Sequence, residues 1–467
     1  MTIEQLYQIF RQHPVITTDS RDVPAGSIFF ALKGDTFDGN LYALAALEQG
    51  AAYAVVDSTS AVAAESDDSR ILTLTPSADA LADTPAGAPV SALQALQCLA
   101  RYHRRQLGTT VIGITGTNGK TTTKELITAV LRKKYNVLST QGNFNNHIGV
   151  PKTLLGLTPE HQMAVVEMGA NHPGEIRTLV GIACPDYGII TNVGKAHLEG
   201  FGSFEGVLRT KGELYDYLRN YGGTVFINND NHHLLSISHD LHVVKYGQTP
   251  AADLLLHGWL TGCNPYVNFV WTPSGAQSAG VDSQEGLAVS THLIGSYNLD
   301  NLLAAACIGT YFGVSPADIC DALAQYTPTN NRSQLTVTPY NRLIVDAYNA
   351  NPTSMAAALD NFNHIQASHK MVILGDMKEL GADSQAEHQA VLARLAAATD
   401  IESVWLVGTE FEEASSALAA CSEVPDWCLF RDVDAVIAAL QNHRPEGRTI
   451  LIKGSNSTHL VRVIDYL

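Results

Sequence analysis

The chain has 467 residues, of which 45% are hydrophobic and 16% charged, a composition that suits a globular protein with several domains. Its formal net charge of −17 argues against nucleic acid or an anionic membrane surface as a partner, because both are negatively charged. We expect a cytoplasmic protein with no integral membrane segment, since the sequence has no signal-peptide pattern, no apolar run long enough to span a bilayer, and no CxxC pair among its seven cysteines.

Residues 1–106 are predicted to form a small α/β domain. Apolar runs at 28–32 and 52–56 predict strands, and the stretch between them predicts a helix. Polar turns stand at the strand ends, for example at 18–21. Such turns either bind a ligand or are simply solvated loops.

Residues 107–328 are predicted to form a central domain organised around a phosphate-binding loop. An apolar run at 111–115 predicts a buried strand and residues 122–134 predict a helix; between them lies Gly116-Thr117-Asn118-Gly119-Lys120-Thr121-Thr122. In such a loop, backbone N–H groups face the phosphates, the lysine reaches the β- and γ-phosphates, and the threonine hydroxyl binds Mg²⁺. The spacing is a variant, G-x-x-G-x-x-G-K-T. The alternative is an ordinary glycine-rich turn.

The rest of the central domain predicts a parallel sheet with helices on both faces. Apolar runs at 137–138, 164–168 and 187–190 alternate with helix-like stretches, which is typical of buried parallel strands. The polar tract 248–286 has no assignment, and a strong helix is predicted over 297–312.

Five residues of this domain are candidates for chemistry. Glu167 ends an apolar strand and is either a Mg²⁺ ligand or a simple strand-end carboxylate. His197 is either a metal ligand or a loop histidine, and Lys211 is either functional or a solvated charge on a helix. Asn298 and Asn301 stand three apart and share a helix face, where two amides would read an adenine edge or cap the helix.

Residues 329–467 are predicted to form a third, Rossmann-like α/β domain. Four short apolar runs each end in a polar or glycine turn, at 343–345, 371–374, 404–407 and 449–452. Ligands gather at the carboxyl ends of strands in open α/β sheets. The turn at 346–352 is dense in hydrogen-bonding groups, and it is either part of a binding site or a plain Asx-rich turn.

Together these residues resemble the Mur ligase family, the ATP-dependent amide ligases of bacterial cell-wall synthesis. The resemblance covers nearly the whole chain: the phosphate loop and the stretches around the other candidates occur in family order, followed by Asn331-Arg332-Ser333 and Asp346. Three stretches, at 142–151, 346–352 and 374–381, are most similar to the member that joins D-alanyl-D-alanine to UDP-MurNAc-tripeptide.

The resemblance implies a nucleotide site with two Mg²⁺ ions. ATP would be bound by the loop, by two asparagines facing adenine, and by residues of the hinge and third domain: Gly116 to Thr122, Asn298, Asn301, Arg332, Asp346 and Asn349. Thr121 and Glu167 would hold the first Mg²⁺, and His197 and a carbamylated Lys211 the second. Lys120, His197 and Lys211 would be the catalytic residues.

The resemblance also implies one domain for each substrate, in a monomer. The first domain would hold the UDP moiety and the third the incoming dipeptide. The residues implied in substrate binding are Ser20, Arg21, Asn143, Asn145, Asn146 and Asn351. Two rival functions are a ligase that adds a single amino acid or folate-type glutamates, and a P-loop nucleotide-binding module that hydrolyses ATP without any peptide acceptor.

Overall fold

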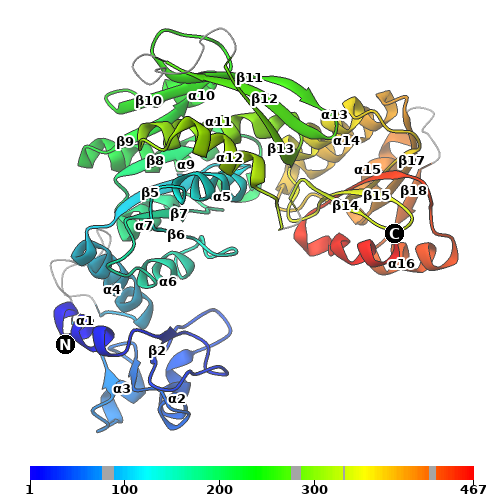
Figure 1. Cartoon of the computed structure of the whole chain (residues 1–467). Coiled ribbons are helices and arrows are strands. Elements are labelled where there is room, and N and C mark those ends of the chain that lie inside the picture. Colours follow the sequence, from blue (N-terminus) through cyan, green and yellow to red (C-terminus); the bar gives the residue numbers. More distant parts are fainter. Residues whose placement is uncertain (76–88, 275–285, 330–331, 420–426) are drawn as a thin grey trace.

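The computed structural model describes residues 1–75, 89–274, 286–329, 332–419 and 427–467. Within these residues it contains three sheets, of four, nine and six strands, each with its own helices. Figure 1 shows the first and third sheets at different sides of the central one. The predicted α/β class with three domains is confirmed, whereas the boundaries at 106 and 328 stay predictions.

The first sheet is parallel, with strand order β1-β2-β3-β4. Both predicted strands are present as β2 and β3, and the helix predicted between them consists of a 3₁₀ turn followed by α2. The elements are α1 (Ile3–Gln12), β1 (Ile16–Thr17), β2 (Ile28–Phe30), η1 (Gly39–Tyr42), α2 (Ala43–Glu48), β3 (Tyr53–Val55), α3 (Ala61–Glu65) and β4 (Ile71–Leu72).

The central sheet has the order β13-β12-β11-β10-β9-β8-β5-β7-β6, with β5 carrying the phosphate loop at its end. Its strands are β5 (Thr110–Thr115), β6 (Val137–Ser139), β7 (Met163–Glu167), β8 (Tyr187–Ile190), β9 (Thr224–Asn228), β10 (His242–Gly247), β11 (Leu254–Cys263), β12 (Tyr266–Pro273) and β13 (Leu287–Ile294). Because β7 and β8 flank β5, their carboxyl-end turns lie beside the loop.

The predicted parallel strands of the central sheet are confirmed, and three further strands form an edge that was not predicted. β12 pairs antiparallel with both β11 and β13. β11 and β12 lie in the tract 248–286 that was left without assignment, of which residues 275–285 lie outside the described residues, and β13 begins directly after it. Along β13, buried positions alternate with exposed ones that include Ser290 and His292, so the apolar run typical of a buried strand is interrupted.

Helices cover both faces of the central sheet, as predicted. They are α4 (Ala92–Leu107), α5 (Lys120–Leu131), α6 (Gly149–Leu155), α7 (Glu175–Ala183), α8 (Leu198–Phe201), α9 (Phe204–Tyr221), α10 (His232–Ser236), α11 (Leu299–Tyr311) and α12 (Pro316–Gln325). Helix α5 begins at Lys120, two residues earlier than predicted, which places both Lys120 and Thr121 in its first turn. No helix in the described part of the chain is long and apolar enough to cross a membrane.

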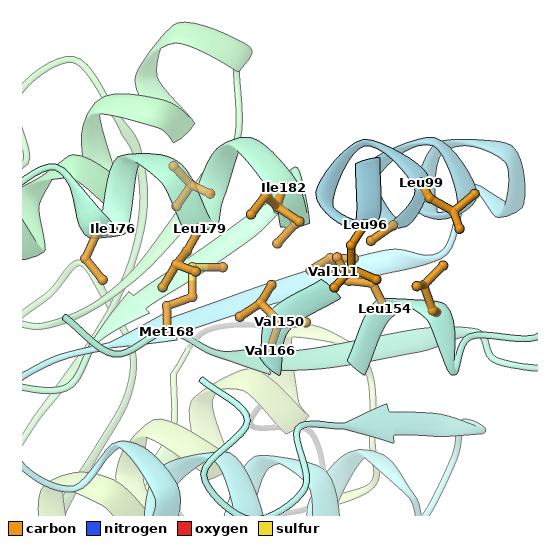
Figure 2. Close-up of a cluster of buried hydrophobic side chains, with 14 of the residues drawn as sticks. Leu96, Leu99, Val111, Val150, Leu154, Val166, Met168, Ile176, Leu179 and Ile182 are labelled. Carbon is orange, nitrogen blue, oxygen red and sulfur yellow. The ribbon is translucent and has the colours of Figure 1, made fainter. Parts of the chain in front are cut away.

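Helix α4 joins the first domain to the central one. It contacts α1 on one side and α6 and α7 on the other. Leu96 and Leu99 of this helix belong to one apolar core with Val111 and Leu154 (Figure 2). The same core includes Phe10 of α1. The two domains therefore share buried apolar surface.

The third sheet has the order β14-β15-β19-β16-β17-β18, parallel except for β14. All four predicted strands are present, and the short edge strands β14 and β18 were not predicted. The elements are β14 (Gln334–Val337), β15 (Arg342–Asp346), α13 (Pro352–His364), β16 (Lys370–Gly375), η4 (Gly381–Asp383), α14 (Ser384–Ala397), β17 (Ile401–Val407), α15 (Thr409–Ala419), β18 (Cys428–Phe430), α16 (Val433–Asn442), β19 (Thr449–Lys453), η5 (Asn456–Thr458) and η6 (Leu460–Tyr466).

Candidate active site

The phosphate loop needs glycine at two positions. Gly119 has φ 77° and immediately precedes α5. Gly116 has φ 144°, and a Cβ there would lie 2.0 Å from the hydroxyl oxygen of Thr191. A left-handed backbone and a close approach both exclude larger side chains, so these glycines do more than form an ordinary turn.

The residues after β8 hold the loop in shape. Thr191 Oγ1 and Asn192 Nδ2 donate to the carbonyl of Asn118 at 2.6 and 3.0 Å. The backbone N–H of Asn118 donates in return to Asn192 Oδ1 at 3.0 Å. Among the residues that follow β8, the sequence analysis predicted only His197 as a site residue. The position of Thr191 and Asn192 directly after a strand that neighbours β5 is the signal that could have found them.

Lys120 curls back over the loop. Its ammonium group donates to the carbonyls of Gly116 and Thr117 at 2.8 and 3.0 Å. Burial lowers the pKa of Lys120 to about 8, with a further lowering from Arg332 and an opposing effect from Glu167. The lysine is thus held where phosphate oxygens would meet it.

Thr121 and Glu167 lie together, as a Mg²⁺ site requires. The Thr121 hydroxyl donates to Glu167 Oε2 at 2.9 Å, and Asn145 Nδ2 donates to Glu167 Oε1 at 2.9 Å. Glu167 is only 1% exposed, so it is not a solvated strand-end carboxylate. Lys124, which sequence reasoning missed, lies with its Nζ 3.9 Å from Glu167 Oε2 and donates to the Thr140 carbonyl at 2.8 Å.

A cavity of about 710 Å³ opens over this loop, between the central and third domains. That volume falls in the range of small-molecule sites. Most of the predicted site residues line it: Thr117, Asn118, Gly119, Lys120, Thr122, Asn145, Asn146, Glu167, His197, Asn298, Asn301, Arg332, Asp346 and Asn349. The walls come from strand ends of both sheets, as expected for open α/β sheets.

Asn298 and Asn301 form part of the cavity wall, but their amides also bond to the protein. Asn301 Nδ2 donates to Asn298 Oδ1 at 2.8 Å, and Asn301 Oδ1 accepts from the Thr123 hydroxyl at 3.0 Å. Asn298 Nδ2 donates to the carbonyl of Ile294 at 2.8 Å. The helix-capping alternative is wrong, because Asn298 makes no side-chain cap at the start of α11.

Arg332 brings an uncompensated donor to the cavity. Its guanidinium lies 3.8 Å from the ring centroid of Tyr348, which also lines the cavity and was not predicted. Arg332 Nε is buried without a hydrogen-bond partner among the described residues. Asn331, which precedes it in the family motif, lies outside the described residues.

The turn after β15 bonds to Lys453 of the neighbouring strand and also lines the cavity. Asp346 Oδ2 accepts from Lys453 Nζ at 2.5 Å, and Lys453 also donates to the carbonyl of Asn349 at 3.3 Å. Asp346, Asn349 and Lys453 all line the cavity, so the turn is more than a plain Asx turn. Lys453 was not among the predicted site residues, although it ends the strand that pairs with β15.

Lys211 is buried, so the alternative of a solvated helix charge is wrong. Its side chain is 2% exposed; its Nζ donates to the carbonyl of Ala170 at 3.2 Å and lies 5.1 Å from the ring centroid of Phe201. Burial lowers the pKa of Lys211 to about 7, with a further lowering from Lys120. The side chain does not line the cavity.

His197 lines the cavity and precedes α8 with φ 49°. Its Nδ1 donates to the carboxylate of Glu379, across the boundary to the third domain. Burial lowers the pKa of His197 against the opposing effect of Glu379, and Lys120 and Lys211 lower it further. The neutral imidazole is the form that binds metal.

The predicted substrate residues do not all gather at the cavity. Ser20, Arg21, Asn143 and Asn351 are not among the cavity-lining residues, whereas Asn145 and Asn146 are. Arg21, whose side chain is 88% exposed, pairs with Asp19 in the first domain.

Asn351 is buried at the domain boundary. Its Oδ1 caps α13 through the N–H of Ser354, and its Nδ2 donates to Asn118 Oδ1 at 2.8 Å. In this structure it therefore connects the third domain to the phosphate loop.

The chain matches three family descriptions along its length. These are "Mur ligase family, catalytic domain" over residues 14–104, "Mur ligase middle domain" over 114–309, and "Mur ligase, glutamate ligase domain" over 331–456. The three matches coincide with the three sheets.

Individual proteins are similar over nearly the whole chain. The UDP-N-acetylmuramoyl-tripeptide--D-alanyl-D-alanine ligase of Escherichia coli K12 is 34% identical, and that of Bacillus subtilis 168 is 32% identical, each over 96% of this chain and 92% of the relative. The crystal structure of MurF from Acinetobacter baumannii superposes with a TM-score of 0.81 at 29% identity, covering 99% of this chain and 98% of that one. With the variant phosphate loop, the three sheets and these relatives in agreement, the chain belongs to the Mur ligase family.

Proposed function

We propose that this chain joins D-alanyl-D-alanine to UDP-MurNAc-tripeptide and consumes ATP in the reaction. The observation that carries the proposal is that one cavity is lined by Lys120 of the phosphate loop, by the buried carboxylate Glu167 and by Asp346 of the third domain. The names of the E. coli and B. subtilis relatives supply the two substrates.

The reaction requires activation of a carboxylate, because carboxylates do not form amides with amines in water at useful rates. The terminal carboxylate of the tripeptide attacks the γ-phosphorus of ATP, the bond to ADP breaks, and an acyl phosphate forms. The amine of the dipeptide then attacks the acyl carbon, inorganic phosphate leaves, and the amine loses a proton. Lys120 neutralises the charge of the phosphoryl transfer, and Arg332 Nε is a buried donor without a partner among the described residues that a phosphate oxygen would satisfy.

The donor set fits Mg²⁺. Thr121 and Glu167 offer one hydroxyl and one carboxylate, and hard oxygen ligands of this kind, few in number, are what Mg²⁺ takes beside a triphosphate. Among the described residues, no group of three or more His, Cys, Asp or Glu side chains is arranged to hold a metal by itself, so phosphate oxygens would complete the site. Bound Mg²⁺ would offset the negative charge of the triphosphate.

We further propose that Lys211 is carbamylated and, with His197, binds a second Mg²⁺. Burial lowers the pKa of Lys211 to about 7, so about half of the molecules carry the neutral amine at neutral pH, far more than for an ordinary lysine. The amine nitrogen attacks the carbon of CO₂ and releases a proton, which gives a carbamate with carboxylate-like oxygens. Burial also protects the carbamate from water.

The substrates are distributed over the domains in this proposal. The first domain, with Ser20 and Arg21, takes the UDP moiety, and the third takes the dipeptide; Asn143, Asn145, Asn146 and Asn351 contribute to substrate binding. An acyl phosphate hydrolyses readily, so the third domain must close over the cavity to exclude water. A monomer in the cytoplasm is part of the same proposal.

The test measures phosphate release from MgATP with UDP-MurNAc-tripeptide, with and without D-alanyl-D-alanine. We expect release that needs both substrates, and a pentapeptide product by mass. Release with a single amino acid or a glutamate in place of the dipeptide would favour another ligase specificity. Release independent of any acceptor would return the chain to a nucleotide-binding module.

Lys211→Ala tests the carbamate. We expect loss of ligation, with rescue by a small added carboxylic acid, and loss of the carbamate signal that ¹³C-bicarbonate gives in the unaltered protein. Arg209→Ala is the matched control. Arg209 is exposed on the same helix, so this change should leave both ligation and the carbamate signal as they are in the unaltered protein. Near-normal ligation by Lys211→Ala would contradict the metal-ligand role.

A further inference from the structure

One residue of the third domain reaches the central-domain histidine of the cavity. Glu379 accepts a hydrogen bond from His197 Nδ1 through its carboxylate. Its backbone carbonyl accepts from the N–H of Glu199 at 3.3 Å, two residues after His197. Side chain and main chain of Glu379 thus engage the same turn of the central domain.

The two partners share an unusual backbone conformation. His197 has φ 49° and Glu379 has φ 63°, and neither is glycine. A non-glycine residue in the left-handed region is strained, and it persists only where the surrounding structure over-determines it. Such residues concentrate at functional sites, and here two of them meet across a domain boundary.

The segment before Glu379 is held firmly in the third domain. The Met377 N–H donates to His388 Nε2 at 3.1 Å, and the Lys378 N–H donates to Ser455 Oγ at 3.0 Å. The buried carboxylate of Asp376 accepts the N–H of Phe411 at 3.1 Å, at the start of α15. Each of the three residues before Glu379 is therefore fixed, although the Glu379 side chain itself is half exposed.

We infer that Glu379 is a positioning residue that sets the ring orientation and tautomer of His197 when the third domain is docked. A carboxylate that accepts from Nδ1–H places the proton on that nitrogen, and Nε2 is then the nitrogen with a free lone pair. The inference rests on the proposed function, in which His197 is a metal ligand. It adds that the ligand is made ready by a residue of the other domain.

Docking and histidine orientation would then be one event. With the third domain away, His197 loses its carboxylate partner and both tautomers become available. With the domain docked, Nδ1 is held by Glu379 and Nε2 is the nitrogen left with a free lone pair. An open site would therefore bind the second metal weakly, and this would reduce idle hydrolysis of ATP before both substrates are enclosed.

A second ion pair in the same boundary provides a control. Lys195 Nζ lies 2.6 Å from Glu387 Oε1, and this pair joins the same two domains without contacting His197. If the effect of Glu379 were only to dock the domain, breaking the Lys195–Glu387 pair would have the same consequences.

The test uses the full chain with ¹⁵N-labelled histidine at pH 8, with ADP and Mg²⁺, and His197→Gln assigns the signal. We expect the Nδ1–H tautomer in the unaltered protein and in Glu387→Gln, and a mixture of tautomers in Glu379→Ala. In parallel, the Mg²⁺ concentration for half-maximal ATP turnover should rise about tenfold or more in Glu379→Ala, as for lost partners of metal-binding histidines. In Glu379→Gln the amide oxygen still accepts the hydrogen bond from Nδ1. The Mg²⁺ concentration for half-maximal turnover should therefore stay within about threefold of that of the unaltered protein.

An unchanged tautomer in a folded Glu379→Ala protein, checked by its thermal unfolding, would overturn the inference. The inference would also be overturned if Glu387→Gln changed the tautomer and the Mg²⁺ requirement as much as Glu379→Ala does. If Glu379→Ala fails to fold, Glu379→Asp replaces it, because its side chain is shorter by one methylene group and draws the carboxylate back from His197. The tautomer measurement needs no peptide substrate, so it stands even if the chain proves to use a different acceptor.

Discussion

The central domain meets its two neighbours through different chemistry. Toward the first domain the contact is apolar: Leu96 and Leu99 of α4 pack with Val111 and Leu154 in one core (Figure 2). All four side chains are fully shielded from water. Separating these domains would expose that surface at a cost of about 25 cal/mol for each Å².

Toward the third domain the contact around the cavity is polar. It includes the amide pair Asn118–Asn351 and the ion pair Lys195–Glu387, beside the contact of Glu379. The apolar contribution to this boundary includes Ile294 of the central domain, which packs into the core of the third domain but does not line the cavity. Hydrogen bonds and exposed ion pairs exchange for water at a net cost of about 1 kcal/mol or less each. From this contrast we expect the first and central domains to stay together as one body, and the third domain to undock more readily than the first.

The sharpest way to break the apolar junction is Leu96→Ala. It removes a fully buried side chain from the shared core, and we expect the unfolding free energy to fall by about 2 to 5 kcal/mol. Urea denaturation followed by circular dichroism measures it. Leu41→Ala is the control, because Leu41 is 79% exposed and should change stability by less than about 0.5 kcal/mol. Equal effects would mean that the junction core carries no special stability.

The corresponding change at the polar junction is Asn351→Ala. It removes the cap of α13 and the hydrogen bonds to Asn118, so we expect a loss of about 2 kcal/mol. Asn351→Asp keeps the capping oxygen and loses only the donor to Asn118, and it should cost about half as much. Urea denaturation, followed by a probe in the third domain, measures the unfolding free energy of both variants. A loss of the same size in both variants would assign the whole effect to the domain contact.

Acid should weaken the apolar junction through His103. Its Nε2 donates to the carbonyl of Leu157 at 2.9 Å, and burial lowers its pKa from 6.5. Below pH 6.5 the unfolded chain therefore binds a proton at this histidine that the folded chain does not bind. As the pH is lowered, the free energy of unfolding decreases by up to about 1.4 kcal/mol per pH unit. Above pH 6.5 the effect vanishes. His103→Gln should lose less stability between pH 6.5 and 5.5 than the unaltered chain, and parallel curves for the two proteins would refute the assignment.

The smallest effect is expected from Lys195→Ala. The pair with Glu387 is partly exposed, so its loss should cost less than about 1 kcal/mol and should matter less at high salt. Distance measurements between labels on the central and third domains should still show more open molecules at low salt. No change in the open fraction would mean that this pair does not contribute to docking.

The local features of the site could be predicted because each depends on a short stretch of chain. The glycines, Lys120 and Thr121 stand where a strand becomes a helix, and Glu167 ends a strand, so period and composition are sufficient to place them. The strands of the third domain follow from four short apolar runs in the same way.

Other features depend on residues far apart in the chain. Lys211 has the pattern of an exposed helical lysine, and only its packing under Ala170 and Phe201 makes it buried and lowers its pKa. The antiparallel edge of the central sheet was left without assignment because, in its last strand β13, exposed residues alternate with buried ones and interrupt the apolar run.

The sequence by itself determined the type of chemistry: a phosphate loop, a carboxylate for a hard metal ion, and three α/β units with polar turns at their strand ends. Only the tertiary structure decided which turns share a cavity. It also decided that Thr191 and Asn192 brace the loop, and that Glu379 meets His197. The physical reason is that strand order and domain docking bring distant residues together, and a local pattern of residues carries no information about either.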